Sequence, residues 1–300
     1  MVVLTGATGF IGTRIARALR ARDIAVRTPV RRPARASTLA GWGCEVVPCD
    51  STDAAAVRDA VNGASVVVHL VSIIHGTRAE FDAVMVEGTR CLVEAAAASG
   101  CRRFVLMSAL GTSAASRSAV PYYASKWEME QAVTQADVAE VVFRPGFVFG
   151  RSGGSLPTFV RQVRLAPVTM VVGSGARRLQ PIWVDDVASF VTESVESDQC
   201  PTGIFELAGP DVVTWNELYG AIAATLGKRR RRLHVPVGLM RAAASALEHL
   251  PNPPVTRDQL TMLELADNVC DPTRANAAFG ITPIGLADML ERSLLGDSAA

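Results

Sequence analysis

The segment Tyr122-Tyr-Ala-Ser-Lys126 places a tyrosine four residues before a lysine, in a chain that has only three tyrosines and two lysines. Chance would produce such a pair only about 0.02 times in a chain of this length and composition. Pro121 can open a helix, on which the two side chains lie one turn apart on the same face. An ammonium about 5 Å away lowers the pKa of a phenol by about two units, towards the range useful for acid–base catalysis. We therefore expect Tyr122 to exchange a proton with a substrate hydroxyl, with Lys126 as its electrostatic partner. An exposed helix with an incidental tyrosine and lysine is the alternative.

The glycines of Gly6-Ala-Thr-Gly9-Phe-Ile-Gly12 lie between an apolar run, residues 1–5, and a stretch with helical spacing, residues 13–22. Glycine makes such a turn tight and lets a pyrophosphate approach the backbone, and the helix that follows presents free N–H groups. The spacing alone is weak, because about 0.15 chance matches are expected, and a turn without a ligand is the alternative. Its position between strand and helix favours a bound dinucleotide. We expect the nicotinamide of this dinucleotide to exchange a hydride with the substrate, and Lys126 to hold the nicotinamide ribose.

The second expected strand, residues 24–30, is followed by Arg31 and Arg32 and by no acidic residue. A carboxylate there would hold the ribose of NAD, whereas two guanidinium groups suit the 2′-phosphate of NADP. We therefore expect NADP in preference to NAD, with two solvated loop arginines as the alternative. Asp50, after the third strand, is a candidate partner for the adenine amino group or a surface-loop residue. The residues expected to contact the cofactor are Gly6, Thr8, Gly9, Phe10, Ile11, Gly12, Arg31, Arg32, Asp50, Leu70, Val71, Lys126 and Pro145.

Apolar runs alternate with helical patterns through the first half of the chain. Strands are expected at residues 1–5, 24–30, 44–48, 65–70, 103–108, 140–144 and 203–208, and helices at 13–22, 53–61, 80–99, 121–135 and 184–196. Strands that read as continuous apolar runs are buried on both faces. The pattern predicts the α/β class: a Rossmann, doubly wound parallel sheet with helices on both faces.

The alternation breaks near residue 150. Residues 151–181 carry glycines, prolines and arginines without a clear repeat, and the chain is mostly helical from residue 214, with breaks at Gly227 and at residues 251–254. We predict that residues 1–150 form the dinucleotide-binding domain, to which residues 184–209 return. Residues 151–183 and 210–300 are expected to form a smaller, mostly helical substrate-binding lobe. Residues 112–119 and 151–183 are candidates for the lining of the substrate pocket.

Composition narrows the class of protein further. Hydrophobic residues make up 49% and charged residues 20%, which is ordinary for a globular protein. Lys and Arg number 30 against 29 Asp and Glu, a balance that argues against a nucleic-acid partner. The six cysteines form no C-x-x-C pair and do not cluster with the four histidines, so no metal site is expected. The longest apolar stretch, residues 64–74, is shorter than the roughly 20 residues of a membrane helix, and a cytoplasmic location is expected.

The motifs resemble a known superfamily. Thr5-Gly-Ala-Thr-Gly-Phe-Ile-Gly12, Tyr122-x-x-Ser125-Lys126 and Phe143-Arg-Pro-Gly146 resemble the short-chain dehydrogenase/reductases, in the extended and atypical branch of NAD(P)-dependent epimerase/dehydratase-like proteins. A narrower group contains the nucleotide-binding accessory subunit of respiratory complex I and its bacterial relatives. The phrases that resemble this group are Gln180-Pro-Ile-Trp-Val-Asp-Asp-Val-Ala188, Phe205-Glu-Leu-Ala-Gly-Pro210 and Thr214-Trp-Asn-Glu-Leu218. The resemblance implies a Rossmann sheet, a nicotinamide cofactor and a Ser-Tyr-Lys triad.

The triad serine is the point of departure from that family. Tyr122 and Lys126 match, but Ala109 stands where extended members usually carry a serine or threonine, and Met85 where many carry an asparagine. The hydroxyl could come from a neighbour, and spacing does not choose among Ser108, Thr112 and Ser113; we name Ser108 as the catalytic candidate.

Two functions are open at this point. The first is an NADP-dependent oxidoreductase or epimerase that acts on a hydroxyl or carbonyl carbon, with a small-molecule substrate of unknown identity. The second is a non-catalytic nucleotide-binding subunit or assembly factor of a larger, complex I-like assembly. The oligomeric state is not encoded in any pattern that we find.

A basic run, Lys228-Arg-Arg-Arg-Arg232, precedes residues 238–250, which place four apolar side chains on one helical face: Leu239, Ala243, Leu247 and Leu250. A solvated loop followed by a helix packed on the core is the simpler interpretation. The alternative is that residues 228–250 contact a membrane surface, which would make the protein peripheral to the membrane, or a protein partner.

Other polar residues favour structural roles. Asp185 and Asp186 begin an expected helix, where acids complement the N–H groups of the first turn. His69 ends a buried strand and His75 lies in the loop beyond it, and neither has a companion that suggests a metal or a catalytic dyad.

Overall fold

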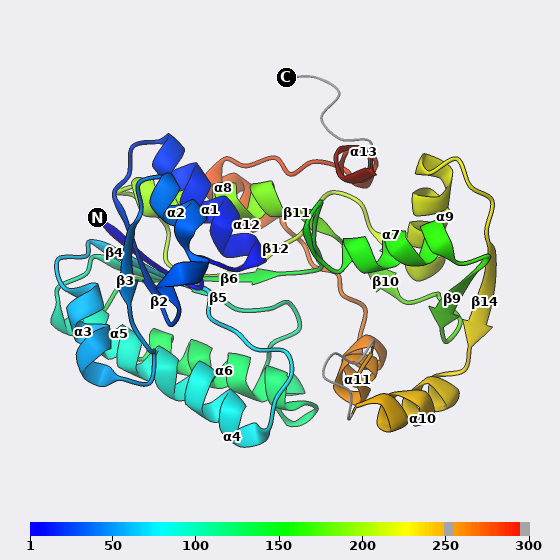
Figure 1. The fold of residues 1–300 in the computed structure, drawn as a ribbon, viewed down its shortest axis with the longest axis horizontal. Coiled ribbons are helices and arrows are strands. Elements are labelled where there is room, and N and C mark those ends of the chain that lie inside the picture. The colour runs from blue at the N-terminus through cyan, green and yellow to red at the C-terminus, as the bar shows by residue number, and fades with distance from the viewer. Residues whose placement is uncertain (249–254, 295–300) are drawn as a thin grey trace. The chain divides into compact units, whose positions relative to one another are not determined.

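The computed structural model describes residues 1–248 and 255–294, which form two compact units (Figure 1). The first unit contains Met1–Pro145, Val184–Leu207 and Pro272–Thr282, and the second contains the remaining described residues. The sequence-based division assigned residues 272–282 to the second lobe. They join the first unit because α12 (Thr273–Phe279) packs the Phe279 ring against the rings of Phe143, Phe190 and Phe205.

A seven-stranded parallel sheet forms the centre of the first unit, with strand order β12-β6-β5-β4-β1-β2-β3. Its strands are β1 (Val2–Thr5), β2 (Val26–Val30), β3 (Glu45–Pro48), β4 (Val66–His69), β5 (Arg103–Met107), β6 (Glu140–Pro145) and β12 (Gly203–Leu207). Every residue of β1, β4 and β5 is buried, which explains why these strands read as continuous apolar runs. The predicted doubly wound α/β sheet is confirmed.

Helices cover both faces of this sheet (Figure 1). One face carries α1 (Phe10–Ala21), α2 (Ser37–Gly41), α8 (Val184–Glu196) and α12, and the other carries α3 (Ala54–Val61), α4 (Arg78–Phe81), α5 (Gly88–Ala98) and α6 (Pro121–Thr134). Asp185 and Asp186 lie in the first turn of α8, as predicted. The strand order reverses between β1 and β4, and ligands of such sheets bind outside the carboxyl ends of the strands at this switch point.

The helix expected over residues 80–99 contains a π-helical segment. α4 starts with a capping box between Thr77 and Glu80, residues Asp82–Glu87 form the π turn, and α5 continues to Ala98. The Thr89 hydroxyl, in the first turn of α5, donates to the carbonyl of Met85 in the π turn at 2.5 Å. Gly100, at φ +69°, follows the end of α5, where a glycine in the left-handed region commonly ends a helix.

The second unit combines short strands with helices. Its strands are β7 (Val148–Gly150), β8 (Gly153–Gly154), β9 (Val168–Val172), β10 (Arg178–Leu179), β11 (Ile182–Trp183), β13 (Val213–Thr214) and β14 (Arg231–Val235). Its helices are α7 (Leu156–Leu165), α9 (Trp215–Thr225), α10 (Val237–Leu247), α11 (Arg257–Leu265) and α13 (Leu286–Leu294). Its centre includes edge-to-face aromatic contacts of Phe159 with Phe149, Trp215 and Tyr219.

The helix expected over residues 238–250 is α10, but its apolar face does not pack on a core. Leu239 is 63% exposed, Ala243 is exposed, and Ala244 is the buried residue of the helix. Leu250 and the break expected at residues 251–254 lie outside the described residues. None of the helices described in the chain combines the length and apolar character needed to cross a membrane.

Candidate functional site

The glycine turn between β1 and α1 has a backbone that admits no side chain at two of its positions. Gly6 has φ +70°, and a Cβ at this position would lie 3.1 Å from the carbonyl carbon of Leu70. A Cβ on Gly12 would lie 2.2 Å from the Gly6 carbonyl oxygen, closer than any real contact. The Gly9 N–H donates to the same carbonyl at 3.0 Å and closes the turn. Glycine is therefore required here for the shape of the turn.

The start of α1 is suited to an anion. Gly9 is its N-cap residue, and in the described structure no side chain caps this end and its first turn holds no acidic residue. Thr8 and Gly9 are exposed, and Phe10 and Ile11 are half-buried. The first N–H groups of a helix have no partner inside the helix and sit at the positive end of its dipole. The turn therefore fits the diphosphate of a dinucleotide.

Leu70 and Val71, which follow the neighbouring strand β4, border this turn, whereas Pro145 lies on β6, two strands beyond β4 in the sheet. The β4 strand is followed by Leu70 and Val71, both half-buried, and the Val71 nitrogen lies 3.2 Å from the Cβ position of Gly6. Pro145 ends β6, is buried, and accepts a hydrogen bond from the Leu110 N–H at 2.9 Å. Leu70 and Val71 thus lie where a nucleotide on the glycine turn would pass over the sheet edge.

Arg31 and Arg32 follow β2, are both exposed, and take part in none of the ion pairs of the described chain. Arg27, inside the same strand, differs, since it pairs with Glu45 at 2.9 Å. The two guanidinium groups at the end of β2 are therefore free to receive a phosphate.

Asp50 follows β3 and is engaged in a local turn. Its carboxylate accepts hydrogen bonds from the N–H of Thr52 at 3.0 Å and from the Thr52 hydroxyl at 2.8 Å. These bonds, with a smaller contribution from the charge of Arg31, lower the pKa of Asp50. This geometry favours the surface-loop role over an adenine contact.

Tyr122 and Lys126 lie on α6, which opens with Pro121 as predicted. Lys126 is 2% exposed, and its ammonium donates to the main-chain carbonyl of Met107, the last residue of β5, at 2.7 Å. The Lys126 Nζ lies 5.8 Å from the centre of the Tyr122 ring. The main chain at the end of β5 thus holds the Lys126 ammonium in place, and α6 places the Tyr122 ring beside it.

The pKa of Tyr122 shifts in the direction opposite to the one predicted. Burial raises the pKa of Tyr122 to about 12, with Tyr123 adding to the effect and a hydrogen bond with Ser72 opposing it. Burial also lowers the pKa of Lys126 to about 8, against the attraction of Glu130. The prediction was wrong because it counted the attraction of the ion pair and left out desolvation of the phenolate. At neutral pH this tyrosine holds its proton, as a proton donor must.

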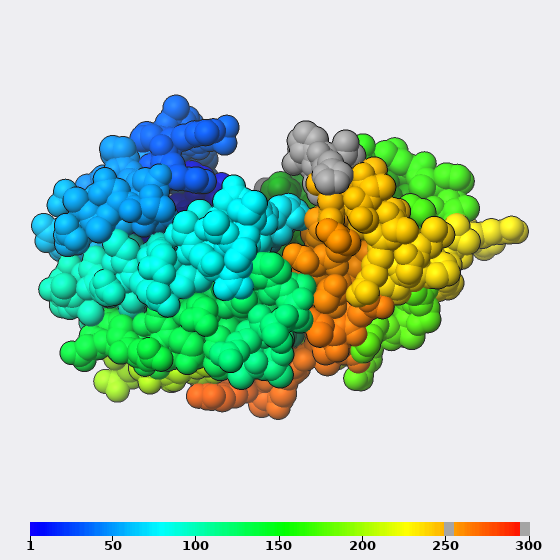
Figure 2. All heavy atoms as spheres, turned by 90° about the horizontal axis from the view of Figure 1, so that it is seen from below, coloured from blue at the N-terminus to red at the C-terminus, as the bar shows by residue number. Residues whose placement is uncertain are grey.

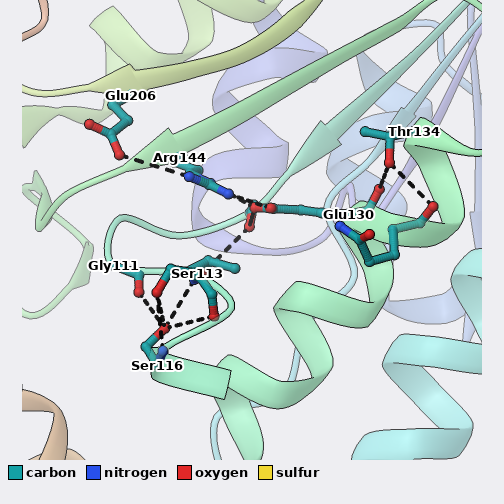
Figure 3. Close-up of polar contacts among 10 residues, drawn as sticks. Gly111, Ser113, Ser116, Glu130, Thr134, Arg144 and Glu206 are labelled. Carbon is teal, nitrogen blue, oxygen red and sulfur yellow. Dashed lines mark hydrogen bonds and ion pairs between the residues drawn. The ribbon is translucent and has the colours of Figure 1, made fainter. Parts of the chain in front are cut away.

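Ser108 binds a buried carboxylate. It is 3% exposed, and its hydroxyl donates to Glu130 at 2.5 Å. Arg144 holds the two oxygens of the same carboxylate at 2.9 and 2.6 Å, and Glu206 lies 3.9 Å from the other side of this guanidinium (Figure 3). A hydroxyl has one proton to donate. While this bond holds, Ser108 cannot donate to a substrate carbonyl, which corrects the role assigned to it from the sequence.

The other hydroxyl candidates are also engaged. Thr112 is 2% exposed and its hydroxyl lies 3.5 Å from that of Ser108. Ser113 hydrogen-bonds Ser116 at 3.1 Å, and Ser116 donates to the carbonyl of Gly111 at 2.6 Å (Figure 3). Both belong to the hydrogen bonding of the loop after β5.

Ser72 is a candidate that the sequence interpretation missed. It lies in the exposed loop after β4, hydrogen-bonds Tyr122, and has its hydroxyl 3.9 Å from the sulfur of the fully buried Met85. Its position at the carboxyl end of a strand beside the switch point could have indicated it. Among the described hydroxyls, that of Ser72 is the one whose hydrogen bond opposes the rise in the pKa of Tyr122.

His69 is a neutral structural link. Its Nδ1 lies 2.6 Å from the Thr5 hydroxyl and its Nε2 lies 3.1 Å from the Thr89 hydroxyl. Thr89 gives its own proton to Met85, so His69 must donate from Nε2 and accept from Thr5 at Nδ1. Burial lowers the pKa of His69 to about 3. The described residues contain no group of three or more His, Cys, Asp or Glu side chains placed to hold a metal ion.

Comparisons with known proteins agree with this geometry. Residues 6–198 match the sequence profile of a family described as NAD(P)H-binding. The chain is 30% identical over 295 residues to the ceramide reductase of Caulobacter vibrioides, covering 96% of this chain and 91% of that protein. It is 27% identical over 256 residues to the mitochondrial NADH dehydrogenase (ubiquinone) 1 alpha subcomplex subunit 9 of Arabidopsis thaliana, covering 82% of this chain and 63% of that protein. Among solved structures, the chain resembles the NADPH-dependent quinone oxidoreductase QOR2 of Escherichia coli, complexed with NADPH. The TM-score is 0.78 at 20% identity, and the alignment covers 97% of this chain and 99% of that chain, which shows a shared fold.

Proposed function

The chain belongs to the NAD(P)H-binding family, and from this premise we propose that it is an NADP-dependent reductase that converts a carbonyl compound to an alcohol, with Tyr122 as the proton donor. The observation that carries the proposal is the pair of Tyr122 and Lys126, whose environment keeps the phenol protonated. The Caulobacter relative, named as a reductase, supports this class over that of an epimerase. Because this relative is named a ceramide reductase, an apolar carbonyl compound is the substrate class to test first.

The cofactor would be held by the glycine turn and by the end of β2. The backbone from Gly6 to Gly12 and the open start of α1 would receive the diphosphate, and Arg31 and Arg32 the 2′-phosphate. Bound NADPH would supply a hydride to the carbonyl carbon. Two exposed arginines that form no ion pair within the described residues support NADP over NAD.

Tyr122 and Lys126, both on α6, carry out the transfer of a proton to the substrate oxygen. As negative charge grows on the substrate oxygen, the Tyr122 hydroxyl gives up its proton to it and becomes a phenolate. The Lys126 ammonium, protonated below about pH 8, then balances the phenolate charge. The Met107 carbonyl holds this ammonium in place before and after the transfer. Solvent returns the proton to the phenolate, which completes the cycle.

Turnover with NADPH and a panel of carbonyl compounds, long-chain ketones, quinones and keto sugars, tests this function. Tyr122→Phe removes the proton donor and is expected to lower turnover by about 100-fold or more, with NADPH affinity within about twofold of wild type. Tyr123→Phe is the matched control, because Tyr123 donates to the carbonyl of Leu110 at 3.3 Å. Turnover that survives Tyr122→Phe would exclude the proposed proton donor.

A non-catalytic nucleotide-binding subunit or assembly factor is the second candidate. The engagement of Ser108 by Glu130, together with Ala109 in the usual position of the triad serine, favours it. The similarity to the Arabidopsis complex I subunit points the same way. This candidate predicts that the protein binds NADPH and that no carbonyl compound of the panel leads to its oxidation.

A further inference from the structure

A basic pocket opens on the second unit, and none of the residues assigned above to cofactor or proton transfer lines it. It has a volume of about 490 Å³ and lies at the end of α9, beside β9 and β14. Four of its lining side chains are cations, Lys228, Arg229, Arg230 and Arg232, and none of the described residues that line it is acidic. Figure 2 shows the chain near residue 230, in yellow, standing out from the surface.

Within the part of the chain that the structure describes, these four cations have no carboxylate partner. Other arginines of the second unit do form ion pairs, such as Arg178 with Asp267 and Arg241 with Glu264. Four positive charges around one concave space repel one another and raise the local concentration of anions.

Hydrogen bonds hold three of the cations in place and leave most of their donors free. Lys228 donates to the carbonyl of Arg164 at 2.9 Å, and Arg230 to the carbonyl of Val163 at 2.9 Å, both at the end of α7. Arg232 donates to the carbonyl of Asn216 at 2.5 Å. Lysine has three N–H donors and arginine five, so each can also bind a ligand. Arg229 makes no hydrogen bond to the described residues and has all of its donors free.

Thr169 is a neutral residue of the same pocket. It is 1% exposed, it lies opposite Arg232 in the pairing of β9 with β14, and it lines the pocket. Its hydroxyl oxygen is buried and has no hydrogen-bond partner in the described structure. Buried hydroxyls without a partner are rare in folded proteins and call for an explanation such as a ligand.

We propose that this pocket binds a phosphate group, with Lys228, Arg229, Arg230 and Arg232 around it and the Thr169 hydroxyl as a further donor. A phosphate has several oxygens that accept from different directions and carries enough negative charge to balance several cations. The phosphate can come from a soluble organophosphate or from a phospholipid head group. Exposed apolar side chains near the pocket, Leu165, Met170 and Leu233, make the second source worth a separate measurement.

Inorganic pyrophosphate is the probe for the first measurement, read from backbone amide shifts of the ¹⁵N-labelled protein. Binding in the pocket shifts the amides of β14 and of the end of α9, whereas binding at the glycine turn shifts those of Gly9 to Gly12, so the two sites are read separately. The double variant Arg229→Gln/Arg232→Gln is expected to weaken binding at β14 by about tenfold or more, and Thr169→Val by about threefold. Arg161→Gln, at an exposed arginine of α7 outside the pocket, is the control and is expected to stay within about twofold.

Co-sedimentation with vesicles distinguishes the two sources of phosphate. Vesicles of neutral phosphatidylcholine are compared with vesicles that also contain an anionic phospholipid. Retention on anionic vesicles that the double variant loses and Arg161→Gln keeps identifies a head group; pyrophosphate binding without retention identifies a soluble ligand. The proposal is overturned if β14 does not respond to pyrophosphate, or if Arg161→Gln weakens the response as much as the double variant does.

Discussion

Ser108 donates its hydroxyl proton to the carboxylate of Glu130 at 2.5 Å, inside the first unit and with both side chains almost fully buried. Arg144 neutralises this carboxylate from the other side. The bond ties the end of β5 to α6, the two elements that hold Lys126. Ser108 thus supports the site through a buried hydrogen bond between the elements that carry it.

Ser108→Ala tests this role. We expect a loss of about 1–3 kcal/mol in the free energy of unfolding, because one acceptor of a buried carboxylate loses its donor. Turnover and NADPH affinity are expected to stay within about threefold of wild type. Chemical denaturation measures the change in stability, and steady-state kinetics and nucleotide titration measure turnover and NADPH affinity. A 100-fold drop in turnover with unchanged stability would instead make Ser108 a catalytic residue.

Ser72→Ala tests the hydroxyl that hydrogen-bonds Tyr122. Ser72 is exposed, so stability is expected to change by less than about 0.5 kcal/mol. Turnover is expected to fall about tenfold because the phenol loses a hydrogen bond that lowers its pKa. Ser72→Thr, which keeps the hydroxyl, should restore most of the rate. If the alanine and threonine variants have equal turnover rates, the Ser72 hydroxyl does not assist the proton transfer from Tyr122.

Gly12→Ala tests the glycine turn. The new methyl group would meet the Gly6 carbonyl oxygen at 2.2 Å, so the turn must change shape and nucleotide affinity should fall by about 100-fold or more. Gly41→Ala is the control, since its Cβ would meet no atom within 4 Å. Fluorescence titration with NADPH checks both variants. Normal affinity in Gly12→Ala would show that the diphosphate does not use this turn.

His69 predicts a dependence of stability on pH. Its pKa is lowered from 6.5 to about 3 in the folded protein, so the unfolded chain binds the extra proton first. The stabilisation is present above pH 6.5 and is lost as the pH falls, by about 2 kcal/mol between pH 7 and pH 5. Denaturation at both pH values should show this loss in wild type and in the control His75→Gln, and not in His69→Gln. A loss of equal size in His69→Gln would assign the effect to other groups.

The sequence was sufficient for the doubly wound sheet, because its strands are buried on both faces and are separated by helical patterns. The resemblance to the short-chain dehydrogenase/reductases and to relatives of the complex I subunit is confirmed by the family match and by the relatives found. The short strands of the second unit were not predicted, since β10, β11 and β13 span two residues each and carry no periodicity. The return of α12 to the first unit was also missed, because it depends on long-range contacts of Phe279.

At the site, the sequence located the helix with Tyr122 and Lys126 and the glycine turn, since both depend on local spacing. It did not predict the direction of the Tyr122 pKa shift, because desolvation depends on the whole surrounding structure. For the same reason it assigned a catalytic hydroxyl to Ser108 and missed Ser72. The partner of a polar side chain is set by tertiary packing, which spacing along the chain does not reveal.

The preference between NADPH and NADH tests the central claim most directly. Titration of the purified protein with each nucleotide is predicted to show NADPH binding at least about tenfold more tightly than NADH. Arg31→Gln/Arg32→Gln should remove this preference and leave NADH affinity within about threefold, while Arg35→Gln, at a neighbouring exposed arginine, should keep it. Tighter binding of NADH, or a preference for NADPH that survives the double variant, would contradict the account.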